Sequence, residues 1–303
     1  MMKITSVSDS DLREAVVAFL EMLEGEGDPG LSENKHMHLG GTHDVVERVA
    51  HTDDGSIAGY AQAAWHRAVN GGYGHWALEL AVAPGFRETS LPSDLAAAVV
   101  EAVGDAAMTL WAHTSYVAGM ANDWGWRRTR ALLEMTCALP VSCDGAAAAG
   151  ITFSTFRRGL DEEAWVVANN LAFAGHPENG ALTIADLEAR IRQPWFDPNG
   201  FFLAWDGDQL AGSCWTKVHG DGRGEIYIIG VVPRWERVGL GRALICRGLN
   251  YLSREKNATA ALLYVEGDND RATTVYEKVG FTVARRISAF SRPRDTTTGP
   301  SVR

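Results

Sequence analysis

The sequence lacks the features that mark several common classes of protein. It has no run of about 20 apolar residues of the kind that crosses a membrane, and its first residues, Met1–Ser6, lack the apolar core of a secretory signal. Basic residues are few for a nucleic-acid or anionic-membrane partner, because the 303 residues carry a net charge of −10. We therefore expect a cytoplasmic protein with no nucleic-acid partner and no membrane partner.

Cysteine is scarce, and histidine does not form a metal-binding pattern. Four cysteines show no Cys-x-x-Cys spacing: Cys137, Cys143, Cys214 and Cys246. We expect buried free thiols rather than disulfides or metal ligands. Three histidines are close in sequence but lie in a Gly-rich loop without a partnering carboxylate pattern, so we expect no metal site there: His36, His38 and His43.

The composition is that of a globular protein, with 46% hydrophobic and 22% charged residues, and the length allows two domains.

Periodicity and caps predict elements in the first half: helix 9–24 capped by Asp9, strands 45–50, 57–65 and 76–82, helix 93–103, strand 108–112, a helix ending near 124–125, and strand 132–139. The second half is predicted to contain strand 151–156, helices 161–174 and 183–192 opened by Asp161 and Thr183, strands 201–205 and 211–218, a further strand and helix within 225–247, strand 261–266, helix 270–278 and strand 281–290.

The two halves follow the same order of elements, which indicates an internal duplication. Pro84 and Pro233 each end a central strand, and Gly125 and Gly280 each end the last helix, in both cases about half of the chain length apart. The small-residue run 142–150 predicts the boundary. We expect domains at 1–141 and 150–292 and a flexible tail at 293–303.

The stretch Glu225–Arg247 is the most informative part of the chain. A β-branched strand stops at Pro233, and a helix follows a tight turn that contains Gly239 and Gly241. Backbone N–H groups in such a turn can converge on a pyrophosphate at the positive end of the helix, although glycines also serve ordinary turns. The dinucleotide fingerprint is disfavoured because Leu244 stands in place of its third glycine, and the Gly-Lys-Ser/Thr of phosphate loops is absent.

This spacing resembles the acetyl-CoA pyrophosphate loop of the GCN5-related N-acetyltransferase (GNAT) family, Gln/Arg-x-x-Gly-x-Gly/Ala, with Glu236 in the first position. The segments Leu263–Asn269 and Ala272–Phe281 extend the resemblance, since in that family the strand before the Asn splays from the central strand and admits the pantetheine arm. The resemblance implies an α/β fold of two tandem GNAT domains, each a mixed, mostly antiparallel sheet flanked by helices. The first half has Gly85–Pro92 instead of the two-glycine turn, so we expect a degenerate domain that binds acyl-CoA weakly or not at all.

Further segments resemble a narrower family, the mycothiol synthases, which acetylate the cysteinyl amine of a cysteinyl-glucosaminyl-inositol. This likeness covers most of residues 150–290 closely and the first half only as domain order. The segments that carry it are Asn169–Gly180, Trp195–Gly200, Trp215–His219 and Gly224–Val231.

The resemblance implies binding residues for both substrates. Those for the acceptor are Glu33, Glu178, Lys217, Glu225 and Tyr264, with Asn34 as an alternative to Glu33. Those for acetyl-CoA are Ile229, Gly230, Val231, Glu236, Arg237, Val238, Gly239, Leu240, Gly241, Arg242, Asn269, Asp270, Arg271, Ala272, Thr273 and Thr274. His176 and His219 either contact sugar hydroxyls or make structural hydrogen bonds.

The reaction needs a base, because an acceptor amine is protonated near neutral pH and must lose a proton before it attacks a thioester. Glu225 stands where the family has its base, and its alternative role is that of an ordinary strand-end glutamate. Backbone N–H groups of 229–231 can polarise the thioester carbonyl, since a splayed strand leaves donors unpaired. The resemblance implies that Tyr276 lies near the thioester sulfur, where it could protonate the departing thiolate, and it can also pack against Phe281.

Glu236 departs from the family, whose members usually have Gln at this position and a basic residue at the position of Val238. The extra negative charge beside the pyrophosphate predicts a weakened affinity for acetyl-CoA. Arg234, Arg237 and Arg242 are candidates to compensate for it.

The resemblance implies the final step of mycothiol biosynthesis, the N-acetylation of the cysteinyl amine of desacetylmycothiol, with acetyl-CoA as cosubstrate, a small thiol-sugar as acceptor and no metal. Direct transfer in a ternary complex is expected, because no cysteine lies in a motif position for an acyl-enzyme. The alternatives are an N-acetyltransferase for another small amine and a non-catalytic acyl-CoA-binding module, against which the presence of both Glu225 and Tyr276 argues. A monomer is expected, because the two halves can supply one another's interface.

Overall fold

The computed structural model describes residues 2–26, 30–32, 35, 39, 44–66, 74–143, 145, 150–174, 176 and 179–293. These residues form two compact units. Unit 1 contains the described residues up to Ala131 together with those from Ile287 onward, and unit 2 contains Leu132–Arg286.

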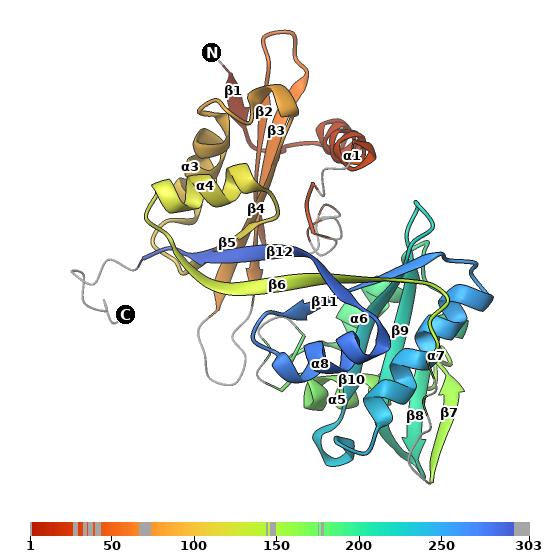
Figure 1. Cartoon of the computed structure of the whole chain (residues 1–303). Helices are drawn as coiled ribbons and strands as arrows, with labels where there is room; N and C mark the ends of the chain where they lie inside the picture. The colour runs from red at the N-terminus through yellow and green to blue at the C-terminus, as the bar shows by residue number, and fades with distance from the viewer. Residues whose placement is uncertain are drawn as a thin grey trace, which may run out of the picture. The chain divides into compact units, whose positions relative to one another are not determined.

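Unit 1 is a sheet with helices on both faces (Figure 1). Its strand order is β1 (Lys3–Thr5), β2 (Val45–His51), β3 (Ile57–His66), β4 (His75–Val82), β5 (Met108–Ala112) and then the end of β12 (Thr282–Ser291). Helix α1 (Ser10–Gly25) packs Phe19 and Leu20 on one face, whereas α3 (Leu91–Val103) and α4 (Ser115–Asp123) pack Leu95 and Val117 on the other. The β4–β5 pair is parallel and the pairs from β1 to β4 are antiparallel, as expected for a mixed, mostly antiparallel sheet.

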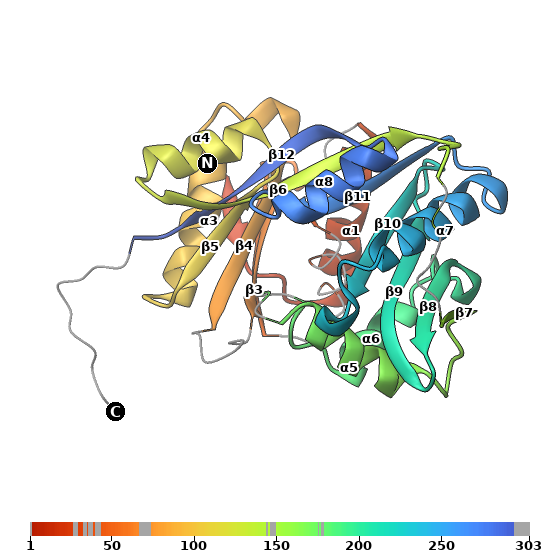
Figure 2. The ribbon, with the colours of Figure 1, turned by 60° about the horizontal axis from the view of Figure 1, so that its bottom comes forward.

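Unit 2 repeats this plan. Its strand order is β6 (Arg127–Ala138), β11 (Ala260–Glu266), β10 (Gly224–Val231), β9 (Gln209–Val218), β8 (Phe201–Asp206) and β7 (Ile151–Thr155). Figure 2 shows α7 (Leu240–Arg254) on the opposite side of β8 and β9 from α5 (Glu162–Ala172) and α6 (Ile184–Ile191), and α8 (Asp270–Val279) packs in the same core as α7. Alternation along β9 explains both cores, because Cys214 faces α7 and the next residue, Trp215, faces α5 and α6.

Strands β6 and β12 contribute to both units. Within unit 1, Thr129 Oγ1 lies 3.0 Å from Ser291 Oγ, and within unit 2 Thr282 Oγ1 donates to the carbonyl of Thr136 at 3.5 Å. The compact units therefore divide the chain after Ala131 and after Arg286. The domain bounds 1–141 and 150–292, which were inferred from the repeat in the sequence, stay a prediction. Of the predicted tail 293–303, only residue 293 is among the described residues.

The end of each helix tests the predicted caps. Asp9 accepts a hydrogen bond from Leu12 N at 2.9 Å, and Thr183 forms a capping box with Asp186, so both predictions are confirmed. Asp161 holds the N-cap position, but its carboxylate binds the guanidinium and backbone N–H of Arg157 instead of the helix, so its predicted capping bond is wrong. The short strand β1 was not predicted.

Two of the four cysteines form a disulfide, Cys143–Cys246, with a Cα–Cα distance of 5.4 Å. The prediction of free thiols is wrong for this pair and confirmed for Cys137 and Cys214, which are buried. The chain after β6 runs against α7 here, since a Cβ at Gly145 would lie 2.5 Å from Ala243 Cα. The two partners are 103 residues apart, so their spacing could not reveal the contact.

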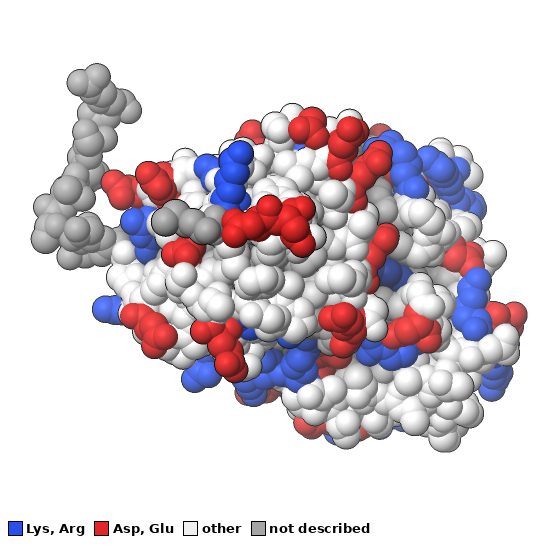
Figure 3. Space-filling view, turned by 90° about the horizontal axis from the view of Figure 1, so that it is seen from above, with Lys and Arg blue, Asp and Glu red and all other residues white. Residues whose placement is uncertain are grey.

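The face shown in Figure 3 is formed mostly of residues other than Lys, Arg, Asp and Glu, and acidic and basic residues are interspersed among them. No helix within the described residues is long and apolar enough to cross a membrane. The described ranges also contain no group of three or more His, Cys, Asp or Glu side chains that could hold a metal ion.

Candidate active site

The central strand β10 separates from β11 partway along its length. The parallel ladder pairs Gly224–Ile226 with Ala261–Leu263, after which β10 continues beside β9 while β11 continues beside β6. The β9–β10 register shifts between Ile226 and Ile228, which leaves Tyr227 as the extra residue of a β-bulge. The bulge re-aims the strand, so that Ile226 lies in the α7 core and Ile228 in the α5 core.

Beyond this point, β10 has backbone donors on the side away from β9. Val232 N–H donates to Ala211 O on β9 at 2.9 Å, and alternation along the strand therefore points the N–H of Val231 to the other side, where β11 has separated. Gly230 serves packing, since a Cβ there would lie 3.0 Å from Ala172 Cβ and 3.1 Å from the Phe173 ring at the end of α5.

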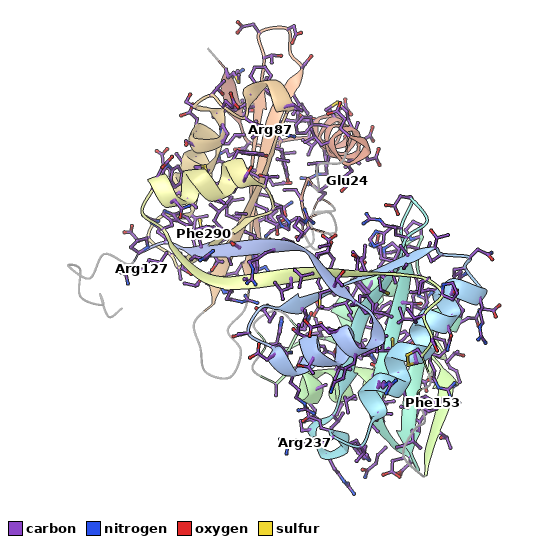
Figure 4. All side chains as sticks on the ribbon, in the orientation of Figure 1. Glu24, Arg87, Arg127, Phe153, Arg237 and Phe290 are labelled. Atoms are coloured by element: carbon purple, nitrogen blue, oxygen red, sulfur yellow. A yellow bond between two sulfur atoms is a disulfide. The ribbon has the colours of Figure 1, made fainter. Side chains whose placement is uncertain are left out.

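The turn after β10 has an unusual backbone. A 3₁₀ turn at Pro233–Trp235 is followed by Arg237 with φ 65° and by Gly239, the N-cap of α7, with φ 83°. Figure 4 labels Arg237 in this turn. Helix geometry leaves the N–H groups of Leu240, Gly241 and Arg242 without intrahelical partners, and the sequence places Arg237 in the preceding turn. This end of α7 therefore suits an anion.

The first turn of α8 lies next to this turn. Asn269 caps α8 by accepting from Ala272 N at 3.1 Å, and Arg271 on the same helix forms an ion pair with Glu236. Glu236 thus pairs with a residue that was not among the arginines expected to compensate for it. One of those, Arg234, donates to Gln209 Oε1 at 3.1 Å instead.

Glu225 is buried at the start of β10, with only 5% of its surface exposed. Lys217 lies directly opposite on β9, and Leu262 lies opposite on β11. The carboxylate has a close partner, because Glu225 Oε2 is 2.7 Å from His219 Nε2. The prediction of an exposed strand-end glutamate as the alternative role is wrong, since the side chain is buried and paired.

Aromatic rings hold Lys217 in position. Its Nζ lies 4.9 Å from the centroid of Trp195 and 5.9 Å from that of Tyr227, the bulge residue. The bulge residue Tyr227 therefore also helps to position Lys217, the lysine that faces Glu225.

Tyr264 lies on β11 and is partly exposed. Its hydroxyl donates to Glu134 Oε2 at 3.3 Å, and Arg285 binds the same oxygen at 2.6 Å. Burial, followed by the charges of Glu134 and Glu225, raises the pKa of Tyr264, so this phenol stays neutral near pH 7. Glu225 pairs with Leu262 across the ladder, and Tyr264 is two residues further along β11, so strand alternation places Tyr264 on the same face of the sheet as Glu225.

Tyr276 lies deeper, in the core beside α7 and α8. Its ring packs edge-on against Phe281 with a centroid distance of 6.1 Å, as expected for its packing role. Burial and then the nearby Cys214 raise the pKa of Tyr276, so it also stays protonated.

The structure brings together many of the predicted site residues within unit 2. Glu33, Asn34 and Glu178 lie outside the described residues, as do His36, His38 and His43. The sequence reasoning missed Trp195 and Tyr227, which hold Lys217, and the pairing of His219 with Glu225. The Gly-rich turn between β9 and β10 offered a signal for that pairing, since it brings the residue after Val218 back toward Glu225.

Comparison with known proteins identifies the family. A family model described as the acetyltransferase (GNAT) family matches residues 156–281. Mycothiol acetyltransferases are similar to this chain: that of Geodermatophilus obscurus is 41% identical over 88% of this chain and 90% of the relative, and that of Streptomyces griseus is 40% identical over 90% of each. That of Kineococcus radiotolerans is 39% identical over 94% of each chain.

Solved structures support the same fold. A tandem GNAT protein from the clavulanic acid biosynthesis pathway aligns with a TM-score of 0.74 at 18% identity over 100% of both chains. A GNAT protein from Sphaerobacter thermophilus aligns with a TM-score of 0.69 at 22% identity over 95% of both. These likenesses confirm the predicted tandem GNAT fold, and with the sequence relatives they show that the chain is an acyltransferase that belongs to the mycothiol acetyltransferase family.

Proposed function

We propose that unit 2 transfers the acetyl group of acetyl-CoA to the cysteinyl amine of desacetylmycothiol (Cys-GlcN-Ins), the final step of mycothiol biosynthesis. The observation that carries the proposal is the separation of β10 from β11 immediately after the buried Glu225. The names of the relatives support the choice of acceptor. A cytoplasmic monomer remains part of the proposal.

The donor side of the site fits acetyl-CoA. Its pyrophosphate would lie at the start of α7, where Leu240, Gly241 and Arg242 offer backbone N–H groups beside cationic side chains. Its thioester carbonyl would receive the N–H of Val231, which points into the gap between the strands. The start of α8, 269–274, would line the other side of the donor.

Glu225 is the proposed base. The ammonium group of the acceptor must lose a proton before nitrogen attacks the thioester, and a carboxylate within reach can take that proton. Lys217 and Tyr264 would orient the polar acceptor around it, since both lie beside Glu225. The predicted contributions of Glu33 and Glu178 to the acceptor site stay predictions.

The departing thiolate needs a proton, and Tyr276 is the proposed donor. The hydroxyl carries its proton at neutral pH and can therefore hydrogen-bond to the departing sulfur, although burial raises its pKa and makes it a weaker acid than a free tyrosine. Direct transfer is favoured over a covalent acyl-enzyme, because burial raises the pKa of Cys137 to about 11 and also raises that of Cys214, while the other two cysteines are in a disulfide.

The test of the acceptor is thiol release from acetyl-CoA with desacetylmycothiol, run beside simple amines and an aminoglycoside. We expect turnover with desacetylmycothiol to exceed that with the other amines. Robust turnover with another amine and none with desacetylmycothiol would overturn this acceptor. Binding of acetyl-CoA without any turnover would favour the non-catalytic module.

The test of the base is Glu225→Gln. Loss of a general base lowers the rate by about 10²–10⁴-fold. We expect the largest loss at low pH, where most of the amine is protonated, and a smaller loss at high pH, where the amine deprotonates unaided. The control is Glu255→Gln, an exposed carboxylate after α7, which should leave the rate unchanged. Wild-type rates of Glu225→Gln at every pH would remove Glu225 from the role of base.

A further inference from the structure

A buried base must release its proton after every turnover. Glu225 is covered on β10, where Lys217 faces it from β9 and Leu262 from β11. A proton taken from the acceptor therefore needs a defined way out before the next acceptor binds. Among the described residues, the contact between Glu225 and His219 offers such a route.

His219 connects this carboxylate to solvent. Its Nε2 is 2.7 Å from Glu225 Oε2, and 27% of its side chain is exposed, against 7% for Glu225. The turn that carries the histidine is fixed by two backbone hydrogen bonds, from His219 N to Arg223 O and from Gly222 N to His219 O, both 2.9 Å. The ring is therefore held in one position, with one nitrogen on the buried base.

The charges around this pair come from three neighbouring elements. Lys217 on β9 and Tyr264 on β11 face Glu225, and Glu134 and Arg285 lie behind Tyr264. In the turn itself, Asp221 binds Arg223 at 2.6 Å. Burial raises the pKa of Asp221, but the hydrogen bonds and the charge of Arg223 outweigh this and hold it below its ordinary value. Asp221 is thus an ionised neighbour on the solvent side of the ring.

We propose that His219 positions Glu225 and carries its proton to solvent. In the first step, an acceptor N–H bond breaks and a Glu225 O–H bond forms. In the second step, the Glu225 O–H bond breaks, a bond from the proton to His219 Nε2 forms, and the proton on Nδ1 leaves to water. Glu225 is then ionised again, and exchange of the imidazole protons with water returns the proton from Nε2 to Nδ1 before the next turnover. This inference rests on the proposed function, because it needs Glu225 to be the base.

The main test is His219→Gly with and without added imidazole, in the thiol-release assay with desacetylmycothiol. We expect kcat to fall by about tenfold or more, within the range of acid–base contributions, with little change in KM for acetyl-CoA. Free imidazole should restore much of kcat, because it can take the proton from Glu225. A purely structural role would not give rescue by imidazole.

The second test is the pH dependence of kcat in wild type and in His219→Gln, which can keep a hydrogen bond to Glu225 but cannot relay a proton. The low-pH limb of the kcat profile should differ between wild type and the variant, because only the imidazole can relay a proton. The matched control is His66→Gln. His66 follows Trp65 at the end of β3 in unit 1, as His219 follows Val218 at the end of β9 in unit 2.

The outcomes separate this inference from the proposed function. Loss of activity in Glu225→Gln, together with imidazole rescue of His219→Gly, supports both. The same loss in Glu225→Gln, but no rescue and an unchanged pH limb in His219→Gln, overturns the relay alone. Wild-type activity of Glu225→Gln overturns the base and the relay with it. If His219→Gly does not fold, the pH profile of His219→Gln decides the question.

Discussion

Units 1 and 2 carry different residues at equivalent positions of their parallel strand pairs, β4–β5 and β10–β11. In unit 2, Lys217 on β9 faces Glu225 on β10, and Glu225 is the middle residue of the parallel pairing with β11. In unit 1, the corresponding middle residue of the β4–β5 pairing is Ala77, and Ala64 faces it from β3. The proposed acceptor end of unit 2 therefore contains a lysine and a glutamate, whereas the equivalent positions of unit 1 hold two alanines.

The two units also end the central strand differently. In unit 1, the strand continues without the register shift seen in β10, and the backbone of Val82 is occupied by side chains: Tyr116 accepts from its N–H at 3.2 Å, and Arg87 Nε donates to its carbonyl at 2.9 Å. The Arg87 guanidinium also lies 5.4 Å from the centroid of Tyr116. Among the residues that the structure describes in unit 2, no side chain takes this place at Val231.

The difference shows how a repeat can keep a fold and lose a site. In unit 1, side chains occupy the backbone groups that are equivalent to those proposed to bind the donor in unit 2. Its buried acid serves packing: Glu79 on β4 accepts from Ser32 N and Oγ at 2.6 and 2.7 Å and lies 3.2 Å from His113 Nε2. We therefore expect the buried glutamate of unit 1 to carry stability and that of unit 2 to carry turnover.

The largest expected effect is on stability, in Glu79→Gln. Removing this charge leaves the buried Lys35 and the neighbouring His113 without their carboxylate, and breaking a buried pair in this way costs about 3–5 kcal/mol. Glu225→Gln should cost less than Glu79→Gln, because its partner His219 is 27% exposed and can be hydrated, whereas His113 is 13% exposed. Urea unfolding monitored by circular dichroism measures both. Equal losses in the two variants would contradict the division of roles.

The same comparison has a pH signature. Burial raises the pKa of Glu79, but the charge and hydrogen bond of His113, then Lys35 and Ser32, outweigh this and lower it to about 2, from an ordinary value of 4.5. A lowered pKa in the folded state contributes stability that is present above pH 4.5 and is lost as the pH falls toward 2. The destabilisation of Glu79→Gln relative to wild type should therefore shrink across this window. A constant difference would mean that the carboxylate charge is not what stabilises unit 1.

The next largest effect is expected at the turn before α7, which differs in backbone conformation from the turn before α3. Gly239 has φ 83°, whereas Ser90, the N-cap of α3 in unit 1, has φ −70°. Gly239→Ala places a side chain in the left-handed region at a cost of about 1–2 kcal/mol and should shift the N–H groups at the start of α7. We expect KM for acetyl-CoA to rise by about tenfold, equivalent to about 1.4 kcal/mol. Isothermal titration with CoA measures the same loss without turnover.

Ser90→Ala is the matched control in unit 1. Its backbone is already in a region that alanine adopts, and its side chain makes no capping bond to the helix. The change should therefore stay within about 0.5 kcal/mol in stability and leave KM unchanged. A similar rise in KM for both variants would show that the turn of unit 1 also contributes to binding.

The sequence predicted the local elements well because their signals are local. Alternation placed β2, β3 and β4 within a residue or two, and Asp9 and Thr183 marked helix starts through hydrogen bonds that span three residues. The separation of β10 from β11 followed from the family pattern. These features depend on neighbours along the chain or on a motif.

The features that were missed depend on contacts between distant segments. The sharing of β6 and β12 between the units, the Cys143–Cys246 disulfide and the Arg271–Glu236 ion pair each join residues at least about 35 positions apart. Asp161 shows the same limit at short range, because Arg157 competes with the helix for its carboxylate. Residue types alone could not predict which two residues bind each other in these cases.

The smallest expected effect comes from Glu236→Gln at the donor end of unit 2. The glutamate pairs with Arg271, and both side chains are partly exposed, so the pair itself contributes at most about 1 kcal/mol. The substitution removes a negative charge beside the proposed pyrophosphate site and releases Arg271 to bind a phosphate instead. We therefore expect KM for acetyl-CoA to fall by a few-fold, with the gain reduced at high salt, where charges are screened.

Arg271→Gln is the informative counterpart, because it removes the cation and should raise KM. An unchanged or higher KM in Glu236→Gln would mean that the ion pair holds the turn in its binding geometry rather than competing with the donor. In that case Glu236 would play for unit 2 the structural part that Arg87 plays for unit 1.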